Sequence, residues 1–247
     1  MSKRKVAVFV EGQTELVFVR DFLRNWYAYD ERVLGFDCVT LFRDDMRTVP
    51  FSCGNEQSEN YYLIVNIGND SSVLSKMLKR MNSLREKEYT YVVGLRDMYS
   101  KQYRDFCGSA SIDIELIKGI EGAAKEEINK SGGNGFLDLH FAVMEVEAWF
   151  IGMSHFLLEI DNRLTPDYIK EHTGVDVRQN PEEAFFHPAA ELNNIYQSVG
   201  KTYRKHLSDI SAITAALNDD DYLNIFTSDR CPSFTKFAEV LLNSKFN

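Results

Sequence analysis

Length, composition and charge predict a folded globular protein and argue against several classes. The chain has 247 residues, of which 44% are hydrophobic and 26% charged, so it can bury a core and is not disordered by composition. Its net charge of −9 argues against a protein that coats nucleic acid with its whole surface, although a local basic patch can still hold phosphates. No apolar run approaches the roughly 20 residues that span a bilayer, so we expect no membrane partner.

The cysteines and the first residues indicate a cytoplasmic protein. Four scattered cysteines form no CxxC pair, which argues against a zinc site or a disulfide framework and fits a reducing compartment. The apolar run that follows MSKRK is too short for a signal peptide. We therefore expect cytoplasmic localisation.

Apolar, β-branched runs alternate with amphipathic segments in the first part of the chain. The run KVAVFV (5–10) is typical of a buried parallel strand, and Thr14 is the expected N-cap of the helix that follows. The polar stretch 43–59 predicts a loop or insertion, and 68–71 predicts a turn. Further strands are expected at 33–42, 61–67, 89–95 and 137–144, and further helices at 73–84 and 112–128. This alternation predicts an α/β fold with a mostly parallel sheet covered by helices.

From about Trp149 onward the pattern becomes helical. Trp149 and Phe150 are expected to anchor the core. Proline and asparagine turns separate the predicted helices, which lie at 165–173, 188–198, 206–217 and 233–242. We expect an α/β domain at residues 1–152 and a helical C-terminal region at residues 153–247 that packs on it.

Acidic residues follow three of the predicted strands. Glu11, Asp97 and Glu145 each stand at the end of an apolar run. Ligands of open parallel sheets bind beyond the carboxyl ends of the strands, so these acids converge if the strands are parallel neighbours. Converging carboxylates repel unless a proton or a cation bridges them, and oxygen-only ligands suit Mg²⁺ or Mn²⁺ better than zinc. The pattern therefore predicts a divalent-metal site of the kind that assists phosphodiester cleavage.

Two alternatives stay open for Glu145 and Glu147. If the strand continues through both residues they share a face and can reach one metal, whereas a helix that has already begun makes them diverge. Each acid also has a structural explanation, because acids at strand ends are often solvated or cap the next helix. Their recurrence at corresponding strand ends favours a shared site.

Several other polar residues have both a structural and a functional explanation. Lys205 belongs to the densest basic segment (201–206), which can grip a nucleic-acid backbone but is more often a solvated face. Arg96 can hold a phosphate or pair with an adjacent acid. Glu15 is a candidate to support a metal ligand from behind, but we expect it to favour the first turn of a helix. No GK[ST] phosphate-binding loop is present, so we expect no Walker-type ATP hydrolysis.

The segments that carry these acids resemble the motifs of Toprim (topoisomerase–primase) domains. VEGQTE (10–15) resembles the first motif. YVVGLRDMYS (91–100) and MEVEAWF (144–150) resemble the second and third motifs of small Toprim-like proteins encoded beside ABC-type ATPases in phage-defence loci. The similarity continues in HPAAELNNIY (187–196), TYRKHLSDISAI (202–213) and RCPSF (230–234), and so covers nearly the whole chain.

The resemblance implies a Toprim-like fold and a role for each acid. Glu11 would be a general acid/base or a metal ligand, Asp97 the central ligand, and Glu145 with Glu147 would complete the site. The usual second motif is DxD, whereas Tyr99 stands here in the second acidic place. Either the two glutamates make up the deficit, or the site holds one metal, or catalysis is weakened.

Together these features predict an Mg²⁺-dependent (or Mn²⁺-dependent) endonuclease, a hydrolase of DNA or RNA phosphodiester bonds. The resemblance implies an anti-phage defence effector with an ABC-type ATPase as its partner, and leaves a homodimer as an option. The alternatives are a catalytically silent Toprim-like subunit that binds the ATPase, and another phosphoryl-transfer enzyme such as a primase-like protein. The predicted catalytic residues are Glu11, Asp97, Glu145, Glu147 and Lys205, and the first four of these are the predicted metal ligands.

Overall fold

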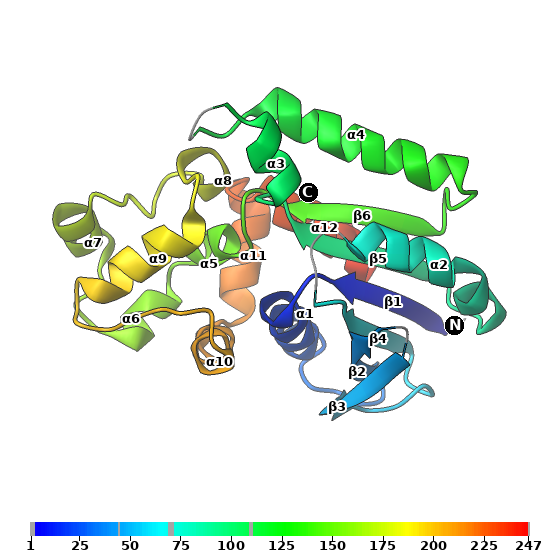
Figure 1. The fold of residues 1–247 in the computed structure, drawn as a ribbon. Helices are drawn as coiled ribbons and strands as arrows, with labels where there is room; N and C mark the ends of the chain where they lie inside the picture. The colour runs from blue at the N-terminus through cyan, green and yellow to red at the C-terminus, as the bar shows by residue number, and fades with distance from the viewer. Residues whose placement is uncertain (1–2, 44, 69–71, 109–110, 247) are drawn as a thin grey trace. The chain divides into compact units, whose positions relative to one another are not determined.

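The protein has a mixed α/β fold built on one six-stranded sheet (Figure 1). The computed structural model describes residues 3–43, 45–68, 72–108 and 111–246. The strand order is β3-β2-β4-β1-β5-β6. The strands are β1 (Arg4–Val10), β2 (Leu34–Phe42), β3 (Asp45–Cys53), β4 (Asn60–Asn66), β5 (Tyr91–Asp97) and β6 (Leu137–Ala142).

Strand β1 is central, and its parallel neighbours are β4 and β5. In this register Val10 faces Asn66 on one side and Leu95 on the other. The hydrogen bonds from Val92 N to Phe136 O and from Met98 N to Ala142 O advance by six residues on both strands, so β6 is also parallel to β5. The expectation of a mostly parallel, helix-covered sheet is confirmed. The carboxyl ends of β1, β5 and β6 therefore follow one another along the sheet.

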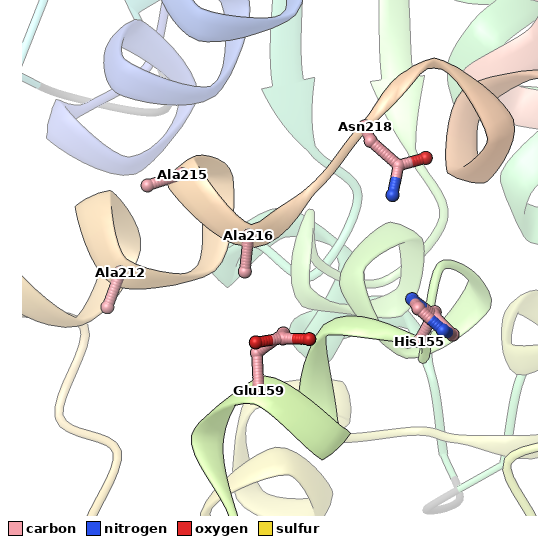
Figure 2. A pocket seen from close by; sticks show the side chains of 6 residues that line it. All are labelled: His155, Glu159, Ala212, Ala215, Ala216 and Asn218. Carbon is pink, nitrogen blue, oxygen red and sulfur yellow. The ribbon is translucent and has the colours of Figure 1, made fainter.

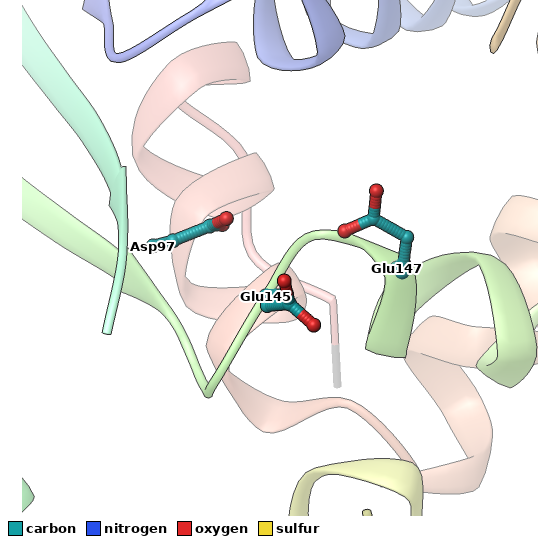
Figure 3. A group of neighbouring side chains, drawn as sticks. All are labelled: Asp97, Glu145 and Glu147. Atoms are coloured by element: carbon teal, nitrogen blue, oxygen red, sulfur yellow. The ribbon is translucent and has the colours of Figure 1, made fainter. Parts of the chain in front are cut away.

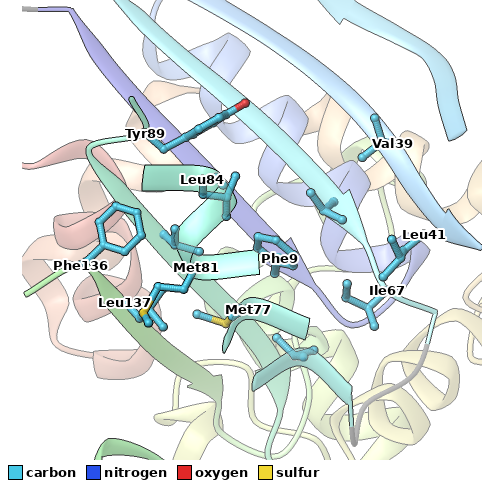
Figure 4. Packing of buried hydrophobic residues seen from close by; sticks show 14 of the residues in the cluster. Phe9, Val39, Leu41, Ile67, Met77, Met81, Leu84, Tyr89, Phe136 and Leu137 are labelled. Atoms are coloured by element: carbon cyan, nitrogen blue, oxygen red, sulfur yellow. The ribbon is translucent and has the colours of Figure 1, made fainter. Parts of the chain in front are cut away.

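The chain divides into two compact units, which are described separately. Unit 1 comprises Met1–Arg96 and Ile114–Phe141, and unit 2 comprises Asp97–Asp113 and Ala142–Asn247. The helices of unit 1 are α1 (Gln13–Trp26), α2 (Val73–Glu86) and α4 (Ile114–Lys130). Figure 4 shows Met77 and Met81 of α2 packed among Phe9 of β1 and Leu137 of β6.

Burial explains why the first strand is apolar on both faces. Val6–Val10 are all fully buried, and Phe9 belongs to the core cluster under α2. Helix α1 contacts β2 and β4. Its N-cap is Gly12 rather than Thr14, so the expected cap is wrong. Glu15 Oε2 accepts the Gly12 N–H at 2.8 Å, which confirms the expected helix-start role of Glu15.

The expectation of a loop or insertion at 43–59 is also wrong. Most of this stretch forms β3, which pairs antiparallel with β2 at the edge of the sheet. An edge strand exposes one side to solvent and tolerates a proline such as Pro50, so its polar sequence is compatible with a strand. The turn expected at 68–71 falls largely on residues 69–71, which lie outside the described residues.

Unit 2 is helical. The helices expected at 165–173, 188–198, 206–217 and 233–242 are confirmed as α7 (Pro166–Thr173), α9 (Pro188–Gln197), α10 (Leu207–Ala216) and α12 (Pro232–Leu242). Five further helices were not expected: α3 (Lys101–Phe106), α5 (Glu147–Gly152), α6 (Phe156–Ile160), α8 (Pro181–Ala184) and α11 (Asp219–Ser228). Within the described ranges, no helix combines the length and apolar character needed to cross a membrane.

Trp149 anchors the core of unit 2, as expected. Its side chain is fully buried, with ring centroids 5.0 Å from Phe234 and 5.8 Å from Phe237 of α12. The indole Nε1–H donates to Glu182 Oε1 at 3.1 Å and to Ser233 Oγ at 2.9 Å. Ser233 also donates to Glu182 through its backbone N–H and its hydroxyl. Burial raises the pKa of Glu182 to about 7 despite these hydrogen bonds.

The raised pKa of Glu182 makes the stability of the protein depend on pH. Below pH 4.5 the carboxyl is protonated in the folded and unfolded chains; between 4.5 and about 7 only the folded chain keeps the proton. Stability therefore falls as pH rises through this window, by about 3 kcal/mol at most. We expect Glu182→Gln to flatten this slope in urea denaturation at a series of pH values, while the exposed Glu183→Gln keeps it. Equal slopes in wild type and Glu182→Gln would contradict the assignment.

Candidate functional site

Three of the predicted acids meet in unit 2. Asp97 is the last residue of β5, Glu145 lies in the turn after β6, and Glu147 is the first residue of α5. One carboxylate oxygen of each lies within 4.8 Å of the others (Figure 3). Asp97 and Glu147 are buried and Glu145 is half-buried, so the group opens to solvent on the side of Glu145.

The backbone after β6 creates this convergence. Strand β6 ends at Ala142, three residues before Glu145, so the expected strand to residue 144 is two residues too long. Met144 adopts a left-handed conformation with φ 61°, which a non-glycine residue rarely takes, and this turns the chain sharply. The Val146 N–H then donates to Asp97 Oδ1 at 2.9 Å. A helix has begun at Glu147, yet the two glutamates do not diverge, because Glu145 lies outside it.

Lys205 places a positive charge among the acids. Its ammonium Nζ is 2.9 Å from Glu145 Oε1 and 3.0 Å from Glu147 Oε2. Lys205 has a φ of 56°, a second left-handed conformation at this site. Two neighbours fix the remaining glutamate oxygens: the Tyr203 hydroxyl donates to Glu147 Oε1 at 2.7 Å, and the Ala189 N–H donates to Glu145 Oε2 at 3.0 Å.

These contacts set the charge states of the group. Burial raises the pKa of Glu147, and the Lys205 ammonium offsets part of the rise. Burial disfavours the ammonium of Lys205, but the charges of Glu147, Asp97 and Glu145 outweigh it and raise the pKa of Lys205. Burial and Glu147 likewise raise the pKa of Tyr203, which stays a phenol. With all three acids ionised, one ammonium against three carboxylates leaves two negative charges.

The donor set fits a hard divalent cation. Two oxygens on opposite sides of one Mg²⁺ are about 4.2 Å apart, so oxygens within 4.8 Å need only a small adjustment to share an ion. Glu147 Oε2 is buried and accepts no hydrogen bond from the described residues, although it lies in ion-pair range of Lys205. Asp97, Glu145 and Glu147 are thus the residues that would hold Mg²⁺ or Mn²⁺.

The structure brings together four of the five predicted site residues: Asp97, Glu145, Glu147 and Lys205. Glu11 lies in unit 1 directly after β1, where its N–H donates to Leu95 O at 3.2 Å, and its part in the site stays a prediction. Tyr203 was not expected to contact the acids. Its place two residues before Lys205 in a basic segment was the only sequence signal.

The remaining basic residues have other contacts. The Lys205 ammonium faces carboxylates, and Lys201 Nζ donates to the carbonyl of Ile160, so segment 201–206 is no continuous phosphate-binding face. The Arg96 guanidinium lies over the Phe141 ring at 5.5 Å.

A shallow pocket elsewhere in unit 2 is a weaker candidate (Figure 2). Its titratable side chains are His155 and Glu159, and His155 Nδ1 is 4.0 Å from Asp221 Oδ1. Small side chains of α10 form much of the wall, so few polar groups converge there. The lining residues are His155, Glu159, Ala212, Ala215, Ala216 and Asn218.

The ion pairs of Lys205 predict a measurable coupling with Glu147. Lys205→Met removes the ammonium that pairs with the fully buried Glu147 carboxylate. Loss of such a partner lowers the free energy of unfolding by about 3–5 kcal/mol in closed sites. We expect about 2 kcal/mol here, because the Lys205 side chain is 37% exposed. Adding Glu147→Gln removes the unpaired charge, so we expect the double variant to recover much of that loss. Urea denaturation of the four proteins in this cycle measures the coupling.

Arg204→Met is the matched control, since it removes an exposed cation from the adjacent position. We expect it to leave stability within about 0.5 kcal/mol of wild type. Additive effects of Lys205→Met and Glu147→Gln would show that the two side chains do not interact in solution.

Comparison with known proteins assigns the chain to a family without a known activity. No curated protein and no solved structure matched it. One family model matched, over residues 10–242, a span that includes Asp97, Glu145, Glu147 and Lys205. The chain therefore belongs to the family described as domain of unknown function DUF4276.

Proposed function

We propose that the protein is a metal-dependent endonuclease of Toprim type that hydrolyses phosphodiester bonds of DNA or RNA. The observation that carries the proposal is the convergence of Asp97, Glu145 and Glu147 within 4.8 Å, where a single ammonium, that of Lys205, pairs with two of the three carboxyl groups. A divalent cation would balance the charge of these carboxylates and would supply Lewis-acid polarisation of a phosphoryl oxygen. The order of VEGQTE, YVVGLRDMYS and MEVEAWF along the chain supports the Toprim assignment.

The protein's own groups have distinct roles in this proposal. Lys205 holds Glu145 and Glu147 in place, and its partly exposed ammonium can face a phosphate. Tyr203 keeps the Glu147 carboxylate oriented by its hydrogen bond. Glu11, by its resemblance to the first Toprim acid, acts as general acid/base or further ligand.

The partners and location belong to the same proposal. An ABC-type ATPase would control the nuclease in a cytoplasmic anti-phage role, and a homodimer is an additional option. The absence of a GK[ST] motif in this chain supports a separate ATPase. Co-purification of the tagged chain with an ATPase tests this part, and recovery of the chain without one from infected cells argues against it.

Hydrolysis assays with matched variants test the activity. We expect purified protein with Mg²⁺ or Mn²⁺ to cleave DNA or RNA, and Asp97→Asn or Glu147→Gln to lower the rate at least about a hundredfold by weakening metal binding. The same variants should lose Mn²⁺ binding in isothermal titration calorimetry.

Asp105→Asn provides the control, since Asp105 is an exposed acid in the same unit. Its rate and its metal affinity should match wild type. Cleavage that survives both Asp97→Asn and Glu147→Gln would place the activity elsewhere or in a contaminant.

A catalytically silent binding subunit is the second candidate. Lys205 and Tyr203 already stabilise the acids through ion pairs and a hydrogen bond, so the cluster can persist as a structural network without a metal. In that case wild-type protein shows neither Mn²⁺ binding nor hydrolysis, while Lys205→Met still destabilises the fold.

A further inference from the structure

We propose that Tyr99, Phe186 and His187 form a stacking platform for an unpaired nucleobase beside the carboxylate group. The inference rests on the proposed function for its class of ligand and adds to it a preference for single-stranded nucleic acid.

The three rings form a corner rather than a stack. The Tyr99 and His187 centroids are 4.7 Å apart at 86°, those of Tyr99 and Phe186 are 5.5 Å apart at 82°, and those of Phe186 and His187 are 4.7 Å apart at 71°. His187 is exposed, and Tyr99 and Phe186 are half-buried. Half-exposed rings held edge to face offer surface that a flat base can cover.

A cation accompanies the platform. The guanidinium carbon of Arg104 lies 5.4 Å from the Tyr99 ring centroid. Arg104 and Lys101 are exposed on α3, which also carries Asp105, so this helix has a net positive charge in a chain of net charge −9. Aromatic side chains beside arginine or lysine match the two parts of a nucleotide, the base and the phosphate.

The platform is tied to the carboxylates through both of its segments. Tyr99 stands two residues after Asp97, and its N–H donates to Met144 O, next to Glu145, at 2.8 Å. In the second segment, His187 stands two residues before Ala189, whose N–H donates to Glu145 Oε2 at 3.0 Å. A strand whose phosphate lies at the carboxylates therefore brings a neighbouring base to the rings.

The geometry selects an unpaired base. In a duplex the faces of the bases are covered by stacking, and only their edges reach the grooves. Rings can cover a base face only when the base is outside the stack, as in single strands or loops. The feature recognised is the base face, which DNA and RNA share.

Fluorescence anisotropy with labelled oligothymidine, oligouridine and a short DNA duplex tests the platform, with Ca²⁺ in place of Mg²⁺ or Mn²⁺ so that a divalent cation still balances the carboxylates while cleavage is suppressed. We expect both single strands to bind more tightly than the duplex. Tyr99→Leu and His187→Leu should each weaken single-strand binding about tenfold, because leucine fills space without a stacking face. Tyr99→Phe should retain wild-type affinity.

Phe106→Leu is the control, because Phe106 is an aromatic residue of α3 that is 69% exposed and outside these ring contacts. Its binding should match wild type, and thermal denaturation should show that each variant is folded. Unchanged binding by folded Tyr99→Leu and His187→Leu, or equal affinity for duplex and single strand, overturns the platform.

The outcomes separate this inference from the nuclease proposal. Single-strand binding that depends on Tyr99, with no hydrolysis under any metal, supports the platform and rejects the endonuclease. Hydrolysis that depends on Asp97, with unchanged binding by Tyr99→Leu, rejects the platform alone.

Discussion

The mutual repulsion of Asp97, Glu145 and Glu147 is the constraint on which this site depends. Carboxylates a few ångströms apart with little solvent are tolerated only when a cation or a proton compensates them. Lys205 supplies one charge, and its ion pairs allow Glu147 to be fully buried. Left-handed conformations at Met144 and Lys205 are disfavoured for these residues, so the packing of unit 2 must offset their free-energy cost.

The same arrangement explains why two functional interpretations compete. A lysine that pairs with two glutamates makes the cluster stable by itself, as a structural network requires. One ammonium nevertheless leaves excess negative charge, and the half-buried Glu145 keeps a side of the group accessible. Hard divalent cations bind such oxygen-rich, negatively charged groups, and this compatibility is the basis of the proposed metal site.

Tyr99, two residues after Asp97, is common to the Toprim resemblance and to the proposed stacking platform. Tyr99 occupies the position at which the DxD motif has its second acid, and its ring lies against Phe186 and His187. In the proposed site Glu145 and Glu147 would supply, with Asp97, the oxygen ligands of the cation. What the position gains is an aromatic surface next to the carboxylates.

Local pattern by itself determined the alternation of elements, the parallel strands and the end of β5 at which Asp97 stands, because burial on both faces demands apolar β-branched runs. It did not place Glu145, which lies three residues beyond the end of β6. Trp149 as a core residue followed from its size. The sequence did not predict the edge strand β3, because one side of it meets solvent and its residues are therefore largely polar. It did not predict short helices such as α5 either, because their stability depends on tertiary packing rather than on periodicity. Only the tertiary structure decided that Lys205 and Tyr203 meet Glu147: they are nearly 60 residues away, and no local rule predicts a left-handed Met144 or Lys205.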